Sequence, residues 1–116
     1  MCLLAVCESG TLPEANFRSA FKINDDGFGF AFRHKDKLNY MKGFMDVDEA
    51  WGVYSAFSRE PIYPHVIHFR LGSPTVDLLT HPFDITIDSE LKLTNSTDGN
   101  VLFHNGVISD WKGRIS

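Results

Sequence analysis

Two segments of the chain carry apolar residues at helical spacing. The first, residues 13–23, begins at Pro13, and proline is favoured at the first position of a helix. The second, residues 46–57, opens with Asp46 and Glu49 at the spacing of a capping box, with Asp in place of the usual Ser or Thr. Both segments are predicted to be amphipathic helices. Their stripes are Phe17, Ala20 and Phe21, with Asn24 as a polar exception, in the first, and Val47, Ala50, Trp51, Tyr54 and Phe57 in the second.

The other apolar segments have the length and alternation of strands. Residues 2–7 form a short apolar run, and residues 25–32 alternate Phe with Gly and Ala after a turn. Further strands are predicted at 37–42, 65–71, 81–87 and 101–104. Two helices among groups of mostly sequential strands indicate an α+β fold with antiparallel sheets.

Two of these strands have faces of different character. Phe28, Phe30 and Phe32 alternate with Gly29 and Ala31, and Val66, His68 and Arg70 alternate with Ile67 and Phe69. The small residues of the first strand allow another backbone or a ligand to approach closely. Arg70 is placed at the end of the second strand.

Length, composition and charge fit one globular domain over residues 1–116. Apolar residues make up 43% of the chain, and ten Phe with two Trp supply material for a core. The net charge of -4 is spread along the chain, which argues against a nucleic-acid surface. The most basic stretch, "RHKDKLNYMK" at 33–42, contains an Asp and alternates with apolar residues, so we interpret it as a solvated strand and turn.

The sequence indicates no targeting or membrane segment. The N-terminal "MCLLAV" lacks the basic flank and length of a signal peptide, and no window approaches ~18 consecutive apolar residues. We therefore expect a cytoplasmic protein without a membrane partner. Cys2 and Cys7 are then reduced thiols, and their spacing places them on opposite faces of one strand.

Metal-ligand patterns are missing from the sequence. No C-x-x-C occurs, and His65 and His68 lie three apart, so on one strand they face opposite ways. We expect neither a metal nor an organic cofactor.

The N-terminus carries the strongest candidate chemistry. If Met1 is removed, Cys2 has a free α-amine beside its thiol, so a base and a nucleophile occupy one residue. An α-amine ordinarily has a pKa of ~7.7 to 8.0, which suits a general base near neutral pH. Taken alone, a cysteine here is more often a buried structural thiol.

An attack on a carbonyl also needs donors for the oxyanion. The stretch "LFHNGVI" is a strong hairpin signal, because Asn-Gly tolerates the positive φ angles of a type I′ turn. Asn105 has a side-chain NH2, and the backbone N–H of Gly106 is not obstructed by a β-carbon. We therefore interpret this stretch as both a turn and a donor site.

Four motifs in order resemble the class II glutamine amidotransferases, which are N-terminal-nucleophile amidohydrolases. They are "MCLLAV", "DDGFGFAF", "HFRLGSPT" followed by "THPF", and "HNGVI", and together they span almost the whole chain. The chain looks most similar to the short stand-alone bacterial and bacteriophage members. The resemblance implies an αββα sandwich of two antiparallel sheets. If a phage encodes the protein, the expected location is the cytoplasm of the host.

The resemblance also implies roles for individual residues. Cys2 would be the nucleophile that forms a γ-glutamyl thioester, with its own amine as base, and Asn105 and Gly106 would form the oxyanion hole. Arg70 matches the arginine that binds the α-carboxylate of the substrate, a role that suits the planar fork of a guanidinium.

Two further positions match the substrate pocket of the family. His81 matches the histidine of H-P-F and would have a supporting role. Ser73 lies where the family often has a substrate-contacting Thr, whereas Pro74 stands where many members have His.

The end of the chain departs from the family pattern. Members continue through further strands and an acidic residue that binds the α-amino group of the substrate, whereas this chain ends ten residues after Gly106. Asp110 follows Gly106 too closely to be equated with that acid. We therefore expect an incomplete second sheet whose edge is exposed unless another chain covers it.

Three functions agree with these observations. The first is hydrolysis of glutamine to glutamate and ammonia. Its expected partner is either a synthetase that receives the ammonia or a further copy of the chain in a homo-oligomer. The second is a catalytically incomplete amidotransferase-like module that binds or inhibits a partner. The third is an amidase of the same chemistry that acts on a γ-glutamyl amide.

Overall fold

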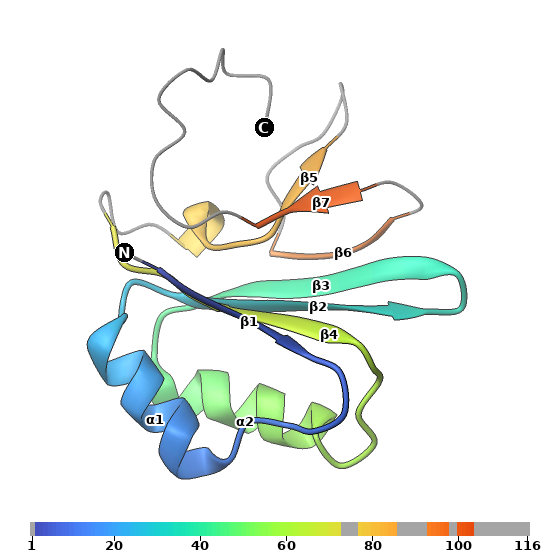
Figure 1. Ribbon diagram of the computed structural model, residues 1–116. Helices are drawn as coiled ribbons and strands as arrows, with labels where there is room; N and C mark the ends of the chain where they lie inside the picture. Colours follow the sequence, from blue (N-terminus) through green and yellow to red (C-terminus); the bar gives the residue numbers. More distant parts are fainter. Residues whose placement is uncertain (1, 73–76, 86–92, 98–99, 104–116) are drawn as a thin grey trace.

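The computed structural model describes residues 2–72, 77–85, 93–97 and 100–103 (Figure 1). They form an α+β fold with an antiparallel sheet and two helices, as predicted. The helices are α1 (Glu14–Ile23) and α2 (Val47–Phe57), and a 3₁₀ turn, η1, covers Asp77–Leu79. The strands are β1 (Leu3–Cys7), β2 (Phe28–His34), β3 (Lys37–Phe44), β4 (His65–Phe69), β5 (Phe83–Ile85), β6 (Thr94–Thr97) and β7 (Asn100–Leu102).

Five strands form one sheet in the order β1-β4-β2-β3-β6, and every pair is antiparallel. Strand β6 was not predicted, because its sequence Thr-Asn-Ser-Thr lacks an apolar face. Besides this sheet, the described residues contain a short antiparallel pair formed by β5 and β7, which does not amount to the predicted second sheet of an αββα sandwich. Figure 1 shows this pair on the face of the sheet opposite to the helices.

Both helices cover one face of the sheet and enclose an aromatic core (Figure 1). Phe17 lies at its centre, with ring centroids 4.9 Å from Phe28 and 5.0 Å from Phe69. Burying each such ring contributes roughly 1.5 to 3 kcal/mol. The predicted helical stripes are confirmed, since all their apolar members are buried in this core or packed against it.

The start of α2 is capped as its sequence predicts. The side chain of Asp46 accepts hydrogen bonds from the backbone N–H groups of Asp48 and Glu49. These groups have no partner within the helix, so the cap satisfies two donors that would otherwise be left to water.

The hairpin of β2 and β3 corrects one prediction. Its loop is Lys35 and Asp36, both with positive φ, and this part is exposed as expected. Further along β3, Tyr40 is 2% exposed and Lys42 is 3% exposed. The interpretation of 33–42 as a solvated stretch is wrong for these two residues, because the segment that contains Pro82 covers this face and accepts a hydrogen bond from the Lys42 ammonium at 3.0 Å.

The small face of β2 lies directly under the chain near His81. A β-carbon built on Gly29 would collide with the carbonyl oxygen of His81 and lie 2.8 Å from Cβ of Lys42. The prediction that small residues let another backbone approach this strand is therefore confirmed.

A buried hydrogen-bond chain joins β4 to α2 within the core. Nδ1 of His65 lies 3.1 Å from the carbonyl oxygen of Ile62, which can only accept, so this nitrogen carries the proton. In the neutral imidazole, Nε2 of His65 accepts from the hydroxyl of Tyr54 at 2.9 Å. The Tyr54 oxygen in turn accepts from the N–H of Leu12 at 3.0 Å. A neutral imidazole with its proton on Nδ1 satisfies both of these contacts.

Stability is expected to fall in mild acid because of this histidine. Burial lowers the pKa of His65 below its ordinary value of 6.5, and the bond to Ile62 opposes this only in part. The unfolded chain then takes up the proton first, so the stabilisation is complete above about pH 6.5 and is lost as the pH falls below it. Urea unfolding at about pH 7.5 and pH 5.5 should show a smaller loss of unfolding free energy for His65→Gln than for the unchanged protein. Equal losses would contradict this assignment.

In the part of the chain that the structure describes, none of the helices has the length and apolar character needed to span a membrane.

Candidate functional site

The N-terminal cysteine lies beside the end of the central strand β4. Strand β1 pairs with β4 so that Leu3 opposes Phe69, and continuing this register places Cys2 opposite Arg70. Opposed residues of an antiparallel pair present their side chains to the same face. The Cys2 thiol, which is half-buried, lies 3.8 Å from the carbonyl oxygen of Leu71. Two of the predicted site residues are therefore neighbours.

Arg70 is held firmly although it follows the last residue of β4. Its backbone N–H donates to the carbonyl of Gly27 at 2.7 Å, and its carbonyl accepts from Asp26 at 2.9 Å. Its side chain is largely buried, with 8% of the residue exposed. Nη1 donates to the carbonyl of Gly72 at 3.4 Å. A buried guanidinium with a fixed orientation is suited to binding a carboxylate through its planar fork.

The loop before β2 supplies a residue that the sequence analysis did not assign. The carboxylate of Asp26 accepts a hydrogen bond of 2.8 Å from the backbone N–H of Gly72. The signal in the sequence was the run Asp-Asp-Gly before a strand, which marks a turn, since Asp side chains often bond to nearby backbone. The partner of this Asp is 46 positions away along the chain, which local patterns do not reveal.

A layer of buried aromatic and histidine rings continues the same face of the sheet. His81 is 3% exposed, and its ring centroid lies 4.0 Å from that of His68 on β4. Phe103 stacks against His81 at 6.5 Å. Since His68 opposes both Leu4 and Gly29, this layer begins one alternation along the strands from Cys2 and Arg70. The structure thus places His81 on the same face as the cysteine, within a packed layer.

The other predicted site residues cannot be placed. Ser73, Asn105 and Gly106 lie outside the described residues, as do Pro74 and Asp110. Their roles as a substrate contact and as an oxyanion hole stay predictions.

The second cysteine has a different environment. Cys7 lies on the helix-covered face of β1 and packs against the aromatic core, so the prediction of opposite faces for the two thiols is confirmed. Burial raises the pKa of Cys7. A thiol with a raised pKa is a poor nucleophile. Cys7 therefore has the properties of a structural residue.

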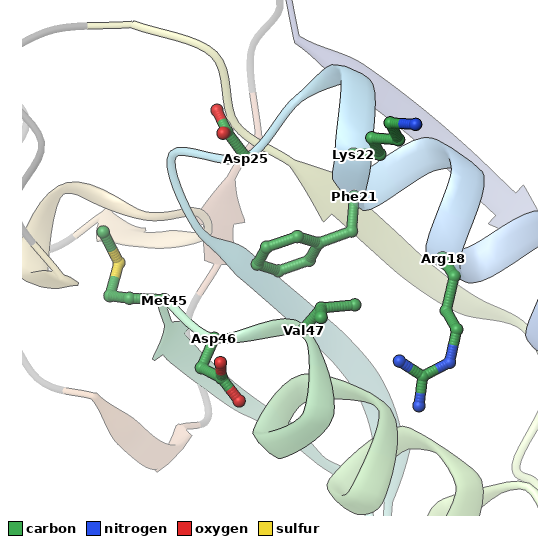
Figure 2. Close-up of a pocket in the computed structure, with 7 residues that line it drawn as sticks. All are labelled: Arg18, Phe21, Lys22, Asp25, Met45, Asp46 and Val47. Atoms are coloured by element: carbon green, nitrogen blue, oxygen red, sulfur yellow. The ribbon is translucent and has the colours of Figure 1, made fainter.

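A pocket with a volume of about 490 Å³ lies between the end of α1 and the start of α2, and Figure 2 shows the side chains that line it. Its lining includes the apolar residues Phe21 and Val47 and charged residues of both signs. One of these, Arg18, is bonded to Glu14 at 2.9 Å and to Asp48 at 2.8 Å. The pocket contains neither Cys2 nor Arg70. Its lining residues are Arg18, Phe21, Lys22, Asp25, Met45, Asp46 and Val47.

Within the described segments, His, Cys, Asp and Glu side chains form no group of three or more that could hold a metal ion. The end of β1 and β4 instead brings together a thiol, a buried guanidinium and a backbone carbonyl, and a thiol with a guanidinium is a combination suited to a small molecule that carries a carboxylate. Comparison of the chain with protein-family models, with curated proteins and with solved structures found no match.

Proposed function

We propose that the chain is a glutamine amidohydrolase of the class II amidotransferase type, with Cys2 as its nucleophile. The observation that carries the proposal is that Cys2 and the buried Arg70 are the residues next to the Leu3–Phe69 pair, at one end of two paired strands. Glutamine offers an α-carboxylate for the guanidinium and a side-chain amide for the thiol. The two helices on a five-stranded antiparallel sheet agree with the first two layers of the family's αββα sandwich.

The reaction uses the two functional groups of a processed N-terminal cysteine. After Met1 is removed, the α-amine of Cys2 takes the thiol proton, and the sulfur attacks the amide carbon of glutamine. The carbon–nitrogen bond breaks, the amine returns the proton to the departing nitrogen, and ammonia leaves a γ-glutamyl thioester. Water then hydrolyses the thioester to glutamate and restores the thiol. Asn105 and Gly106 would donate to the oxyanion in both steps.

These steps require no metal or organic cofactor. The ammonia would pass to a synthetase partner or be released, and a second copy of the chain is the alternative partner. We place the reaction in the cytoplasm of a bacterium or of a phage-infected host.

Intact mass and glutamate release together test the proposed function. Purified protein should lack Met1 and should release glutamate from glutamine. A form with one additional residue before Cys2 should be inactive, because its α-amine is then bound in a peptide. A protein that retains Met1 and shows no turnover would contradict hydrolysis and would favour the binding or inhibitory module.

The choice of amide is tested in the same assay. Release of glutamate from a γ-glutamyl peptide at a higher kcat/KM than from glutamine would make the protein a γ-glutamyl amidase of the same mechanism. We expect glutamine to be preferred.

A further inference from the structure

We propose that Asp26 is a positioning residue of the candidate site, which holds the turn Arg70–Gly72 so that the Arg70 guanidinium stays beside the Cys2 thiol. This inference deepens the proposed function and rests on it for its role in catalysis. Its geometric content, a fixed guanidinium next to a thiol, can be measured without any turnover.

The turn needs support from outside the sheet. Strand β4 ends at Phe69, so the ladder with β1 and β2 does not extend to Leu71 and Gly72. These two residues are exposed, and Leu71 is 41% exposed. An exposed turn beyond a strand end keeps one conformation only when hydrogen bonds fix its backbone.

Asp26 supplies two of these bonds from one residue. Its backbone N–H donates to the carbonyl of Arg70 at 2.9 Å, and its carboxylate accepts from the N–H of Gly72 at 2.8 Å. The two bonds bracket Leu71, whose carbonyl oxygen is the group 3.8 Å from the Cys2 thiol. The carboxylate bond is charge-assisted and therefore stronger than a bond between neutral groups.

Gly72 connects Asp26 to the guanidinium of Arg70 through hydrogen bonds. The carbonyl of Gly72 accepts from Nη1 of Arg70 at 3.4 Å. A β-carbon built on Gly72 would lie 3.5 Å from Nη2, so the guanidinium also packs against this residue. Asp26 thus binds the N–H of Gly72, and the C=O of Gly72 binds the side chain of Arg70. Because a guanidinium has five N–H donors, the bond to Gly72 leaves a fork for a substrate carboxylate.

The experiment compares two alkylating reagents at Cys2 in a Cys7→Ala background. Iodoacetate carries a carboxylate and iodoacetamide does not, so the ratio of their rates at the thiol reports a guanidinium held beside it. Arg70→Gln defines the ratio without this guanidinium, and we expect it to be roughly fivefold lower than in the Cys7→Ala parent. Circular dichroism and thermal unfolding monitor the fold of each variant.

The direction in which the rate ratio changes distinguishes a positioning role of Asp26 from an effect of its charge alone. Asp25→Ala is the matched control, since it removes one negative charge at the neighbouring exposed position, and it should leave the ratio equal or raise it. Asp26→Ala removes the same charge but should lower the ratio to the value of Arg70→Gln. Asp26→Asn keeps an acceptor oxygen for Gly72 and should behave like Asp25→Ala. A ratio for Asp26→Ala that equals or exceeds the Asp25→Ala control would overturn the proposal.

A second variant decides the matter if Asp26→Ala does not fold. Asp26→Glu keeps the charge and displaces the acceptor by one methylene, so a lowered ratio supports positioning and an unchanged ratio contradicts it. With glutamine as substrate, Asp26→Ala should raise KM roughly tenfold with a smaller change in kcat, and Asp26→Asn should restore KM. If the protein without substitutions shows no turnover of glutamine, the proposed function is refuted. The alkylation ratios would still decide the role of Asp26.

Discussion

Replacing Cys2 with alanine is expected to lower glutamate release from glutamine by at least about 10³-fold, because the sulfur that forms the thioester is lost. Cys2→Ser keeps a hydroxyl, which is a far weaker nucleophile at neutral pH, and should lose nearly as much activity. The fold should be unaffected, since Cys2 precedes β1 and its side chain is half-buried. The measurement is glutamate production under saturating glutamine, with thermal unfolding as a check on the fold.

Cys7→Ala is the matched control for this result. Cys7 is the other thiol of the chain, lies on the same strand and packs against the core on the opposite face. Its replacement should keep most of the activity and lower stability slightly, since a partly buried sulfur is removed. Loss of activity in Cys7→Ala with full activity in Cys2→Ala would identify Cys7 as the nucleophile and contradict the mechanism proposed above.

Gly29→Ala is expected to destabilise the protein by at least about 3 kcal/mol, or to prevent folding, because the added carbon has no space. It would collide with the carbonyl oxygen of His81 and approach Cβ of Lys42 to 2.8 Å. The obstructing groups are backbone and the first carbon of a side chain, so neither can rotate away. Either β2 or the segment over it must move, which also displaces the layer formed by His68 and His81.

Gly52→Ala is the control substitution of the same kind. Gly52 lies within α2, and a β-carbon there meets no atom within 4 Å. Alanine should raise stability by roughly 0.5 to 1 kcal/mol, since glycine is unfavourable inside a helix. Urea unfolding of the two variants should therefore move in opposite directions. A Gly29→Ala protein as stable as Gly52→Ala would show that the Thr80–Pro82 segment does not rest on β2.

Several elements were predictable because their signals are local. The helical stripes, the Asp46 cap and the alternation of Phe28 with Gly29 depend on residues within a few positions of one another. The alternation of β4 likewise assigned His65 and His68 to opposite faces, and the structure agrees, with His65 in the helix-covered core and His68 in the other layer. The prediction of opposite faces for Cys2 and Cys7 follows from the same periodicity.

The candidate site was predictable only as separate residues. Cys2 and Arg70 were named from motifs 68 positions apart, and pairing of β1 with β4 is what brings them together. Asp26 was missed, since its partner Gly72 comes close only after β2 and β4 pair. The burial of Tyr40 and Lys42 was missed for a similar reason, because a segment about 40 residues later in the chain covers that face.

The sequence by itself determined which segments become helices or strands and which face of each is apolar, because backbone periodicity converts neighbouring residues into a face. Only the tertiary structure decided the strand order β1-β4-β2-β3-β6, the polar strand β6, and the side chains that meet at the strand ends. These depend on hydrogen bonds between strands distant in sequence. The backbone N–H and C=O groups that form such bonds are the same in nearly every residue, so the local sequence does not specify which strand will be the partner.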